Sequence, residues 1–430
     1  MKQLVWSELT AGERIAAIAR PEQRTDERLQ SIVRSIVDEV RRRGWEGLVD
    51  ISRRIDGEEP RHVEVGPLAA DARRRLPAEQ VEALELAASR IRTFHEASRP
   101  SDFAISTAPG VSVTKTWRSI DRVGLYVPGG KTPLFSSLLM LAIPARAAGV
   151  LEIVAMTPPR PEGGLDKLIA LAAQLSGIER VWTAGGAQAI AALAFGAGPI
   201  PKVDKICGPG NAWVAEAKRL VSGLAGGPAI DMPAGPSELM VIADEGAHCG
   251  LVAADLLSQA EHDAAAQVFL VTPCAKLADG VAREIEARID SLPRRDIAEE
   301  SLQRARIVIV ADAEQAVEVA NLYAPEHLAL AVEDPGDLVP KVRNAGAVFA
   351  GRFAAETFGD YLSGSSHVLP TDGAARAWGG VSVYTFLKAM SVQSVTLEGA
   401  RQIAGPAAIL ARMEALEAHA RAADARMEIA

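Results

Sequence analysis

The sequence of 430 residues predicts an α/β protein with two doubly wound parallel-sheet domains, a helical N-terminal segment and a C-terminal helical tail. From about residue 122 onward, short apolar runs alternate with helical patterns, which is typical of parallel sheets covered by helices on both faces. The alternation comes in two separate series, and a single core seldom grows beyond about 250 to 300 residues. We therefore expect two sheets in two domains.

Helices are expected through the first hundred residues. Apolar side chains recur there at the helical period with charged residues between them, as in Ile32, Val33, Ile36, Val37 and Val40. The same pattern covers residues 81 to 94. Each apolar stripe predicts a helix that packs one face against the rest of the protein.

The strands are expected in two Rossmann-like series. The first series comprises 122–127, 151–156, 180–183 and 203–206. The second series comprises 238–244, 267–272, 306–311, 327–332 and 346–351. Active sites in such folds lie at the carboxyl ends of the strands. After about Ser391 the pattern becomes helical again and ends in a charged amphipathic tail, which we expect to pack across an oligomer interface.

Composition places the chain among ordinary globular proteins, with 48% hydrophobic and 23% charged residues. The net charge of −9 argues against nucleic acid as a partner, because phosphate binding needs clustered Lys and Arg. The longest apolar stretches, such as 138–144, fall well short of the roughly 18 residues of a membrane span. The N-terminus has acidic residues where an export signal needs an apolar run. We expect a cytoplasmic protein that binds neither nucleic acid nor membrane.

Five polar or glycine-rich loops follow predicted strands, and nucleotide binding is a reasonable inference from them. Glycine allows a close backbone approach, and a following helix offers unpaired N–H groups to an anion. The dinucleotide fingerprint GxGxxG is absent, because GPGNAW has only its first two glycines. Each loop taken alone is also explained as a tight turn. The loops are 126–134, 185–190, 207–211, 234–238 and 359–371.

Several polar residues in these regions are candidates for chemistry. Adjacent Glu326 and His327 open a predicted strand and could serve two proton transfers. Gln259 and His262 share one face of a helix end and could hold a metal ion or a polar ligand, although a capped and partly solvated helix end is the simpler explanation of these residues taken alone. The nitrogen and oxygen ligands that suit zinc or manganese are Gln259, His262, Asp360 and His419.

The three cysteines have no CxxC spacing, which fits a reducing compartment and excludes a cysteine-based zinc cage. Cys207 is the one candidate for a thiol nucleophile of the aldehyde dehydrogenase kind. A small residue that ends a strand is the simpler interpretation of it.

Read in order, the loops resemble the successive motifs of the histidinol dehydrogenase family over essentially the whole chain. The matching stretches are GLYVPGG, AGGAQAIAALA, GPGN, IDMPAGPSE, LLSQAEHD, APEHL and GDYLSGSSHVLPT. The resemblance implies a homodimer that uses zinc and NAD. It also implies the last step of histidine synthesis, the oxidation of L-histidinol through L-histidinal to L-histidine with the reduction of two NAD.

Carried over by position, the resemblance implies that one zinc ion per subunit is bound by Gln259, His262, Asp360 and His419, the last from the partner's tail. Glu326 and His327 would be catalytic, with Glu326 activating water. The residues implied to contact substrate are Ser237, Gln259, His262, His327, Asp360, His367, Glu414 and His419. The residues implied to contact NAD are Tyr126, Gln188 and Asn211.

We expect the chain to divide into four parts. Residues 1–24 would form an N-terminal helical arm, and residues 122–234 an α/β domain that binds NAD. Residues 25–121 together with 235–378 would form the α/β domain that carries the metal and catalytic residues. Residues 379–430 would form a helical tail exchanged between subunits.

Two departures from the family pattern leave another function open. Ser366 stands where the family commonly has Asn, and residues 379–383 read GGVSV. Both flank the expected substrate pocket, so the alternative is a related zinc and NAD dehydrogenase that oxidises another small polar alcohol, such as a sulfonated diol. A nucleotide-binding module without catalysis is the non-enzymatic alternative, and the intact Glu326–His327 pair argues against it.

Overall fold

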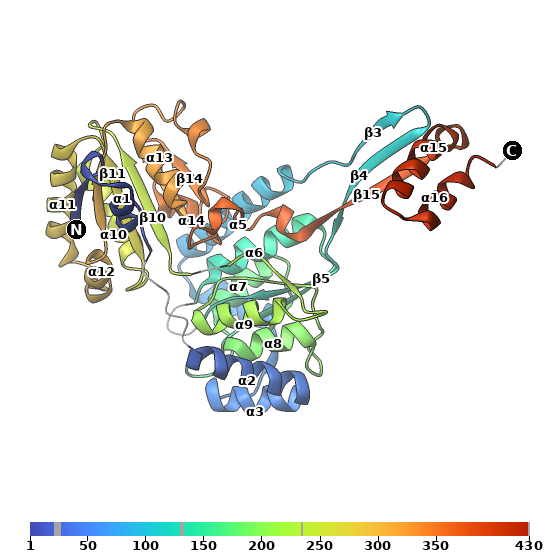
Figure 1. Ribbon diagram of the computed structural model, residues 1–430. Coiled ribbons are helices and arrows are strands. Elements are labelled where there is room, and N and C mark those ends of the chain that lie inside the picture. The colour runs from blue at the N-terminus through green and yellow to red at the C-terminus, as the bar shows by residue number, and fades with distance from the viewer. Residues whose placement is uncertain (21–26, 130–132, 234, 429–430) are drawn as a thin grey trace.

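The computed structural model describes residues 1–20, 27–129, 133–233 and 235–428. Within these residues two six-stranded sheets and one three-stranded sheet form the framework (Figure 1). The predicted fold class, α/β with two parallel sheets, is confirmed. The expected boundaries at 24/25 and 234/235, and the middle of the loop 126–134, fall on residues outside the described ranges.

Sheet 1 has the strand order β2-β7-β6-β5-β8-β9, in which β2 is antiparallel to β7 and the other pairs are parallel. Alternate residues of its strands enter two different cores: Leu125 faces one core and Tyr126 the other. Both faces are therefore covered by helices. The strands are β2 (Arg61–Glu64), β5 (Arg122–Tyr126), β6 (Glu152–Thr157), β7 (Arg180–Thr183), β8 (Lys205–Cys207) and β9 (Ala229–Ile230).

Eight helices in the described residues cover sheet 1. One core is shared by α4 (Val65–Arg75), α5 (Ala78–Ala97), α6 (Phe135–Ala148) and α7 (Lys167–Leu175). The other is shared by α2 (Glu27–Arg43), α3 (Trp45–Ile55), α8 (Gly186–Phe195) and α9 (Ala212–Ser222). The expected grouping of residues 25–121 with 235–378 therefore differs from the structure, since α2 to α5 pack on sheet 1. Periodicity indicates an apolar stripe but not the surface that it will cover.

Sheet 2 is parallel throughout, with the order β1-β12-β11-β10-β13-β14. Its strands are β1 (Lys2–Val5), β10 (Glu238–Ala243), β11 (Gln267–Thr272), β12 (Arg306–Ile309), β13 (His327–Ala331) and β14 (Ala347–Ala350). One face is covered by α10 (Cys249–Ala260), α11 (Ala275–Ile289) and α12 (Arg295–Leu302), and the other by α13 (Ala313–Tyr323) with the N-terminal segment. The short helix α14 (Glu356–Tyr361) follows β14.

The sequence led us to expect a helical N-terminal segment, but the segment is only partly helical. It begins with β1, which pairs in parallel with β12, and only then forms α1 (Ala11–Ala17). A four-residue strand is too short to display a period of its own, and its pairing partner lies some 300 residues away in the sequence. The short 3-10 helices in the described part of the chain are η1 (Trp6–Glu8), η2 (Val339–Lys341), η3 (Ala374–Arg376) and η4 (Val383–Phe386).

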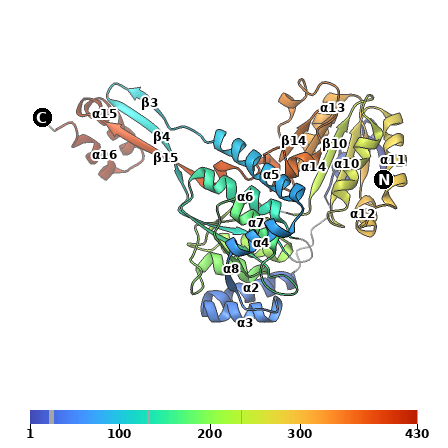
Figure 2. The same ribbon diagram turned by 180° about the vertical axis from the view of Figure 1, so that it is seen from behind.

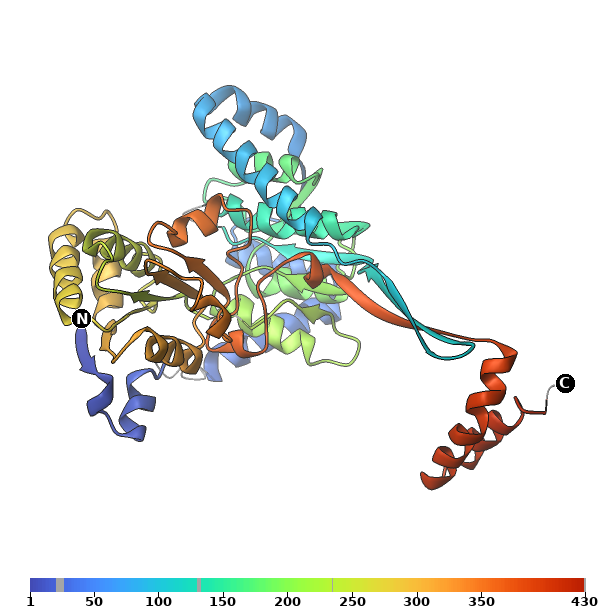
Figure 3. The same cartoon turned by 90° about the horizontal axis from the view of Figure 1, so that it is seen from above.

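Sheet 3 forms an arm that projects away from both sheets and carries the C-terminal helices at its tip (Figures 1, 2 and 3). It consists of β3 (Phe103–Ala108), β4 (Val111–Ser119) and β15 (Leu387–Val395), all antiparallel. The expected helical tail 379–430 is therefore corrected at β15, while α15 (Leu397–Met413) and α16 (Glu417–Asp424) are helical. Pairing with β4 stabilises β15 as a strand, and this partner lies far away in the sequence. No helix in the described residues is long and apolar enough to span a membrane.

Candidate active site

The adjacent acid and imidazole lie at the amino edge of sheet 2. His327 is the first residue of β13, and it stands opposite Leu239 of the parallel strand β10. Both Glu326 and His327 are buried, with 5% and 4% of their surface exposed. The fold class led us to expect the active site at the carboxyl edge. This pair lies instead at the amino edge, where the starts of the neighbouring strands β10 and β13 lie side by side.

Hydrogen bonding selects one tautomer of His327. Its Nδ1 lies 3.1 Å from the backbone oxygen of Glu238, and a carbonyl oxygen can only accept, so Nδ1 carries the proton. The other nitrogen, Nε2, is buried without a hydrogen-bond partner and lies 3.7 Å from Asp360 Oδ1. In the neutral ring Nε2 therefore has a free lone pair that can accept a proton.

Glu326 is held by Glu238 of β10, the residue whose carbonyl also binds His327. The backbone N–H of Glu238 donates to Glu326 Oε2 at 2.9 Å, and this oxygen lies 3.5 Å from His327 Nδ1. The peptide groups of one residue thus orient both members of the pair. Glu238 begins β10 and Glu326 immediately precedes the neighbouring strand β13, so their contact depends on the sheet order.

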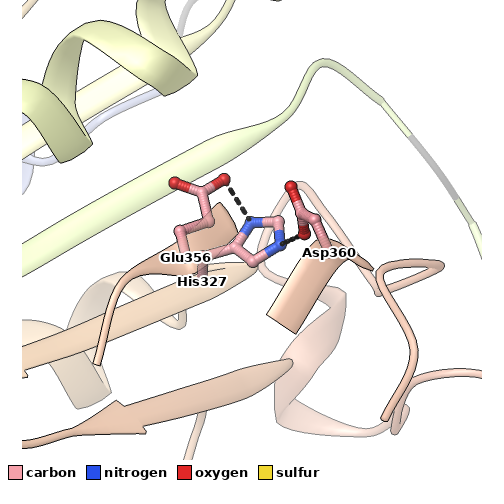
Figure 4. A group of neighbouring side chains, drawn as sticks. All are labelled: His327, Glu356 and Asp360. Atoms are coloured by element: carbon pink, nitrogen blue, oxygen red, sulfur yellow. Dashed lines mark ion pairs between the residues drawn. The ribbon is translucent and has the colours of Figure 1, made fainter. Parts of the chain in front are cut away.

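Helix α14 adds two carboxylates to the site (Figure 4). Glu356 and Asp360 are four residues apart and lie on the same helical face, and Glu356 Oε1 is 3.7 Å from His327 Nδ1. A Cβ at Gly359 would collide with the ring of Phe349, which stacks on His327 with centroids 5.8 Å apart. Glycine therefore allows α14 to approach closely enough for the two carboxylates to flank the imidazole.

The sequence prediction did not include Glu356. Its spacing from Asp360 was the available signal, since a partner at i+4 on a helix shares its face. The structure groups His327, Glu356 and Asp360 so that one ligand atom of each lies within 4.8 Å of the others, a geometry that could hold a metal ion.

Burial and neighbouring charges shift the pKa values of this group. Burial raises the pKa of Glu356 to about 8. Burial also disfavours charge on His327, but the nearby carboxylates of Glu326 and Glu356 outweigh it, so the pKa of His327 lies well above its usual value. Burial raises the pKa of Asp360, but the neighbouring histidines lower it by more, so the pKa of Asp360 lies below its usual value.

Gln259 and His262 meet at the end of α10, as their spacing predicted. Gln259 Nε2 lies 3.1 Å from His262 Nδ1, while Gln259 Oε1 is fully buried and has no hydrogen-bond partner. Asp360 Oδ1 also lacks a partner. Buried oxygens without a donor are costly unless something satisfies them, and a cation would do so. The donor set present in the chain therefore fits a divalent metal such as zinc.

The remaining predicted substrate residues fall into two groups. Ser237 precedes β10, and the His367 ring contacts the Asp360 backbone oxygen through Nδ1 and Ser137 Oγ through Nε2, each at 3.0 Å. Because Ser137 lies on α6, His367 links the sheet 1 side of the molecule to the sheet 2 side. Glu414 and His419 belong to the C-terminal segment at the tip of the arm, and α16 lies far from α10 and α14 within one chain (Figure 1).

The predicted nucleotide residues lie at the carboxyl edge of sheet 1. The hydroxyl of Tyr126, which ends β5, accepts from the N–H of Gly186 at 3.1 Å. The amide of Gln188 donates to Asp56 Oδ2, also at 3.1 Å. Asn211 caps α9 by accepting from the N–H of Val214 at 3.2 Å. Strand order reverses between β5 and β8, and ligands of such sheets bind at that switch point.

The loop after β8 is held rigidly. Asp231 Oδ2 accepts from the N–H of Gly208 at 2.7 Å, and Lys218 Nζ donates to the Gly208 carbonyl at 2.9 Å and to Asp231. Cys207 is fully buried in this framework, and burial raises the pKa of its thiol far above the usual value. A buried protonated thiol is not a nucleophile, so the structure rules against the cysteine mechanism.

A buried imidazole with an unpartnered nitrogen beside one sheet, and a strand-order reversal of the kind at which nucleotides bind in the other, are the features expected of a dehydrogenase that uses a nucleotide cofactor. The chain belongs to the histidinol dehydrogenase family, whose sequence profile matches residues 18–427.

Individual relatives are similar over their whole length. The histidinol dehydrogenase of Xanthomonas campestris pv. campestris is 46% identical, with 100% of both chains covered. That of Vibrio parahaemolyticus is 42% identical, with 100% of this chain and 99% of the relative covered. The crystal structure of histidinol dehydrogenase from Elizabethkingia anophelis superposes with a TM-score of 0.95 at 38% identity, covering 100% of this chain and 98% of that one. These matches do not favour the alternative of another small polar alcohol.

Proposed function

We propose that this chain oxidises L-histidinol through L-histidinal to L-histidine and transfers two hydrides to two molecules of NAD. The observation that carries the proposal is the buried Glu326–His327 pair, because a four-electron oxidation needs two proton-accepting groups beside one reacting carbon. Similarity over the whole chain to histidinol dehydrogenases supports the substrate.

In the first oxidation, His327 Nε2 takes the hydroxyl proton while hydride leaves the carbinol carbon for the nicotinamide. In the neutral imidazole Nε2 suits this role, because it has no hydrogen-bond partner and Nδ1 is committed to the Glu238 carbonyl. The product is the aldehyde L-histidinal. In the second oxidation water adds to the aldehyde: Glu326 takes a proton from that water, and His327 returns its proton to the carbonyl oxygen. Hydride then leaves the hydrated carbon while His327, neutral again, accepts a hydroxyl proton.

Gln259, His262 and Asp360 would hold a zinc ion together with His419 of a second copy. Bound zinc is redox-inert and would supply a fixed positive charge that orients the amino alcohol and imidazole of the substrate. The unpartnered oxygens of Gln259 and Asp360 support this assignment. Tyr126, Gln188 and Asn211 would contact NAD, and Ser237 and His367 would line the substrate site.

A homodimer in which each tail completes the partner's site accounts for the arm. The tail helices lie away from the body of their own chain (Figure 3). Apolar residues of α15 are unusually exposed, among them Leu410 at 62% and Met413 at 78%. Exposed apolar clusters of this kind mark protein–protein contacts. Glu414 and His419 would thereby reach the substrate of a second copy.

The function is tested by counting products. We expect two NADH formed per L-histidinol consumed when NAD is in excess and zinc is present, measured by absorbance. Release of one NADH with accumulation of aldehyde would contradict the double oxidation. NADH formed from a sulfonated diol but not from L-histidinol would overturn the proposed substrate.

Replacing Glu326 with glutamine should slow the second oxidation more than the first. The amide oxygen can still accept from the N–H of Glu238, so the local fold is kept, but the side chain no longer accepts a proton from water. We expect a loss of about 10²-fold with L-histidinal and a much smaller loss with L-histidinol in single-turnover assays. The matched control is Glu318→Gln on the exposed side of α13. Equal losses on the two substrates would contradict the role of Glu326.

A further inference from the structure

Arg20 of the N-terminal segment reaches the frame that holds the acid–imidazole pair. Its guanidinium donates two hydrogen bonds to the Glu238 carboxylate, from Nε to Oε1 at 2.5 Å and from Nη2 to Oε2 at 2.7 Å. The Glu238 side chain is buried, with 1% exposed. A planar guanidinium with two parallel bonds restricts the orientation of both groups more than a single contact does.

The same guanidinium holds a second segment of the site. Arg20 Nη2 also donates to the backbone oxygen of Ala324 at 3.2 Å, and its carbon lies 3.9 Å from the ring centroid of Tyr323. Ala324 has a φ of 57°, a left-handed conformation that is unfavourable for a residue with a Cβ. This strained residue lies two positions before Glu326. Arg20 therefore contacts both the start of β10 and the turn that leads into β13.

Glu238 connects Arg20 to the reacting groups. Its side chain binds Arg20, its N–H donates to Glu326 Oε2, and its carbonyl accepts from His327 Nδ1. A shift of this one residue would therefore change the position of the base that activates water and of the imidazole that accepts the hydroxyl proton. Arg20 itself contacts neither of these side chains in the hydrogen bonds and ion pairs of the described residues.

We propose that Arg20 is a positioning residue, which holds Glu326 and His327 in place through Glu238 and Ala324. The inference rests on the proposed function for the roles of the two catalytic groups. Without Arg20 the buried Glu238 carboxylate would lose its charged partner. A buried carboxylate without a charged partner moves toward solvent or takes up a proton. The N–H of Asp372 still donates to Glu238 Oε1 at 3.1 Å, so the segment keeps one contact and the variant should fold.

The first test compares two arginines of the same segment. Arg14 provides a matched control, since it donates to the Trp6 backbone oxygen at 3.1 Å and lies over the Trp6 ring at 5.4 Å, away from Glu238. We expect Arg20→Gln to lower kcat for both oxidations by about tenfold with little change in KM, because small displacements of reacting groups impair turnover more than binding. Arg20→Lys should lie between Arg20→Gln and the unchanged chain, and Arg14→Gln should keep its kcat.

The second test does not depend on activity. The exchange of the Glu238 amide with deuterium, followed by mass spectrometry on peptides that contain this residue, reports whether its N–H remains bonded to Glu326. We expect faster exchange in Arg20→Gln and Arg20→Lys but not in Arg14→Gln, at temperatures below the thermal midpoints of all variants.

The outcomes separate this inference from the proposed function. Absence of NADH formation in the unchanged chain, with faster Glu238 exchange in Arg20→Gln, would reject the function and keep the positioning contact. Normal kcat and normal exchange in Arg20→Gln would overturn the inference. Equal losses of kcat in Arg20→Gln and Arg14→Gln would also overturn it, because they would indicate a general loss of stability. If Arg20→Gln does not fold, the same criteria apply to Arg20→Lys.

Discussion

Replacement of His327 by asparagine should reduce both oxidations by about 10² to 10⁴-fold, the range that general base catalysis typically contributes. Asparagine can still donate an N–H toward the Glu238 carbonyl, so the start of β13 keeps its main contact. It has no basic group in place of Nε2, which is the nitrogen without a hydrogen-bond partner. Both steps release a hydroxyl proton, and so both should be impaired.

Single-turnover assays with L-histidinol and with L-histidinal measure this effect. The matched control is His248→Asn, since His248 is an exposed histidine that precedes α10. Zinc content must be measured in parallel, because His327 lies 3.7 Å from Asp360 and its loss could disturb a bound metal. Unchanged turnover of either substrate, with zinc retained, would show that another group accepts the hydroxyl proton.

Mixing two inactive variants should restore activity if the tails are exchanged between subunits. We expect His262→Asn and His419→Asn each to be nearly inactive alone, since each removes a proposed zinc ligand. In a mixed dimer one site combines the intact His262 of one chain with the intact His419 of the other. Random pairing should therefore yield roughly a quarter of the activity of the unchanged dimer, because half of the dimers are mixed and each has one intact site.

The experiment distinguishes two arrangements of the arm. The two variants are unfolded together, refolded with zinc, and assayed for NADH, with each variant refolded alone as the control. A chain that used its own His419 would remain inactive in the mixture, because every site would lack one ligand. Size determination of the refolded protein reports whether dimers formed, so a failed reassembly is recognised as such.

Local features of the sequence were sufficient for much of this protein. The nine predicted strands match nine of the twelve strands of sheets 1 and 2, because the apolar run of a buried parallel strand is a property of consecutive residues. The short strands β1, β2 and β9 at the sheet edges were not predicted. The contact of Gln259 with His262 followed from their spacing on one helix. The arm strands β3 and β4 were not predicted, because strands that bury little surface show only a weak alternation of apolar and polar residues.

Only the tertiary structure decided which distant segments meet. The sequence by itself determined the fold class and the adjacent Glu326–His327 pair, since both depend on near neighbours in the chain. The packing of α2 on sheet 1, the pairing of β15 with β4 and the contacts of Glu356 and Arg20 could not be read from it. A side chain's period or charge specifies the kind of partner that it needs, whereas the folded backbone determines which of many equivalent partners comes within bonding distance.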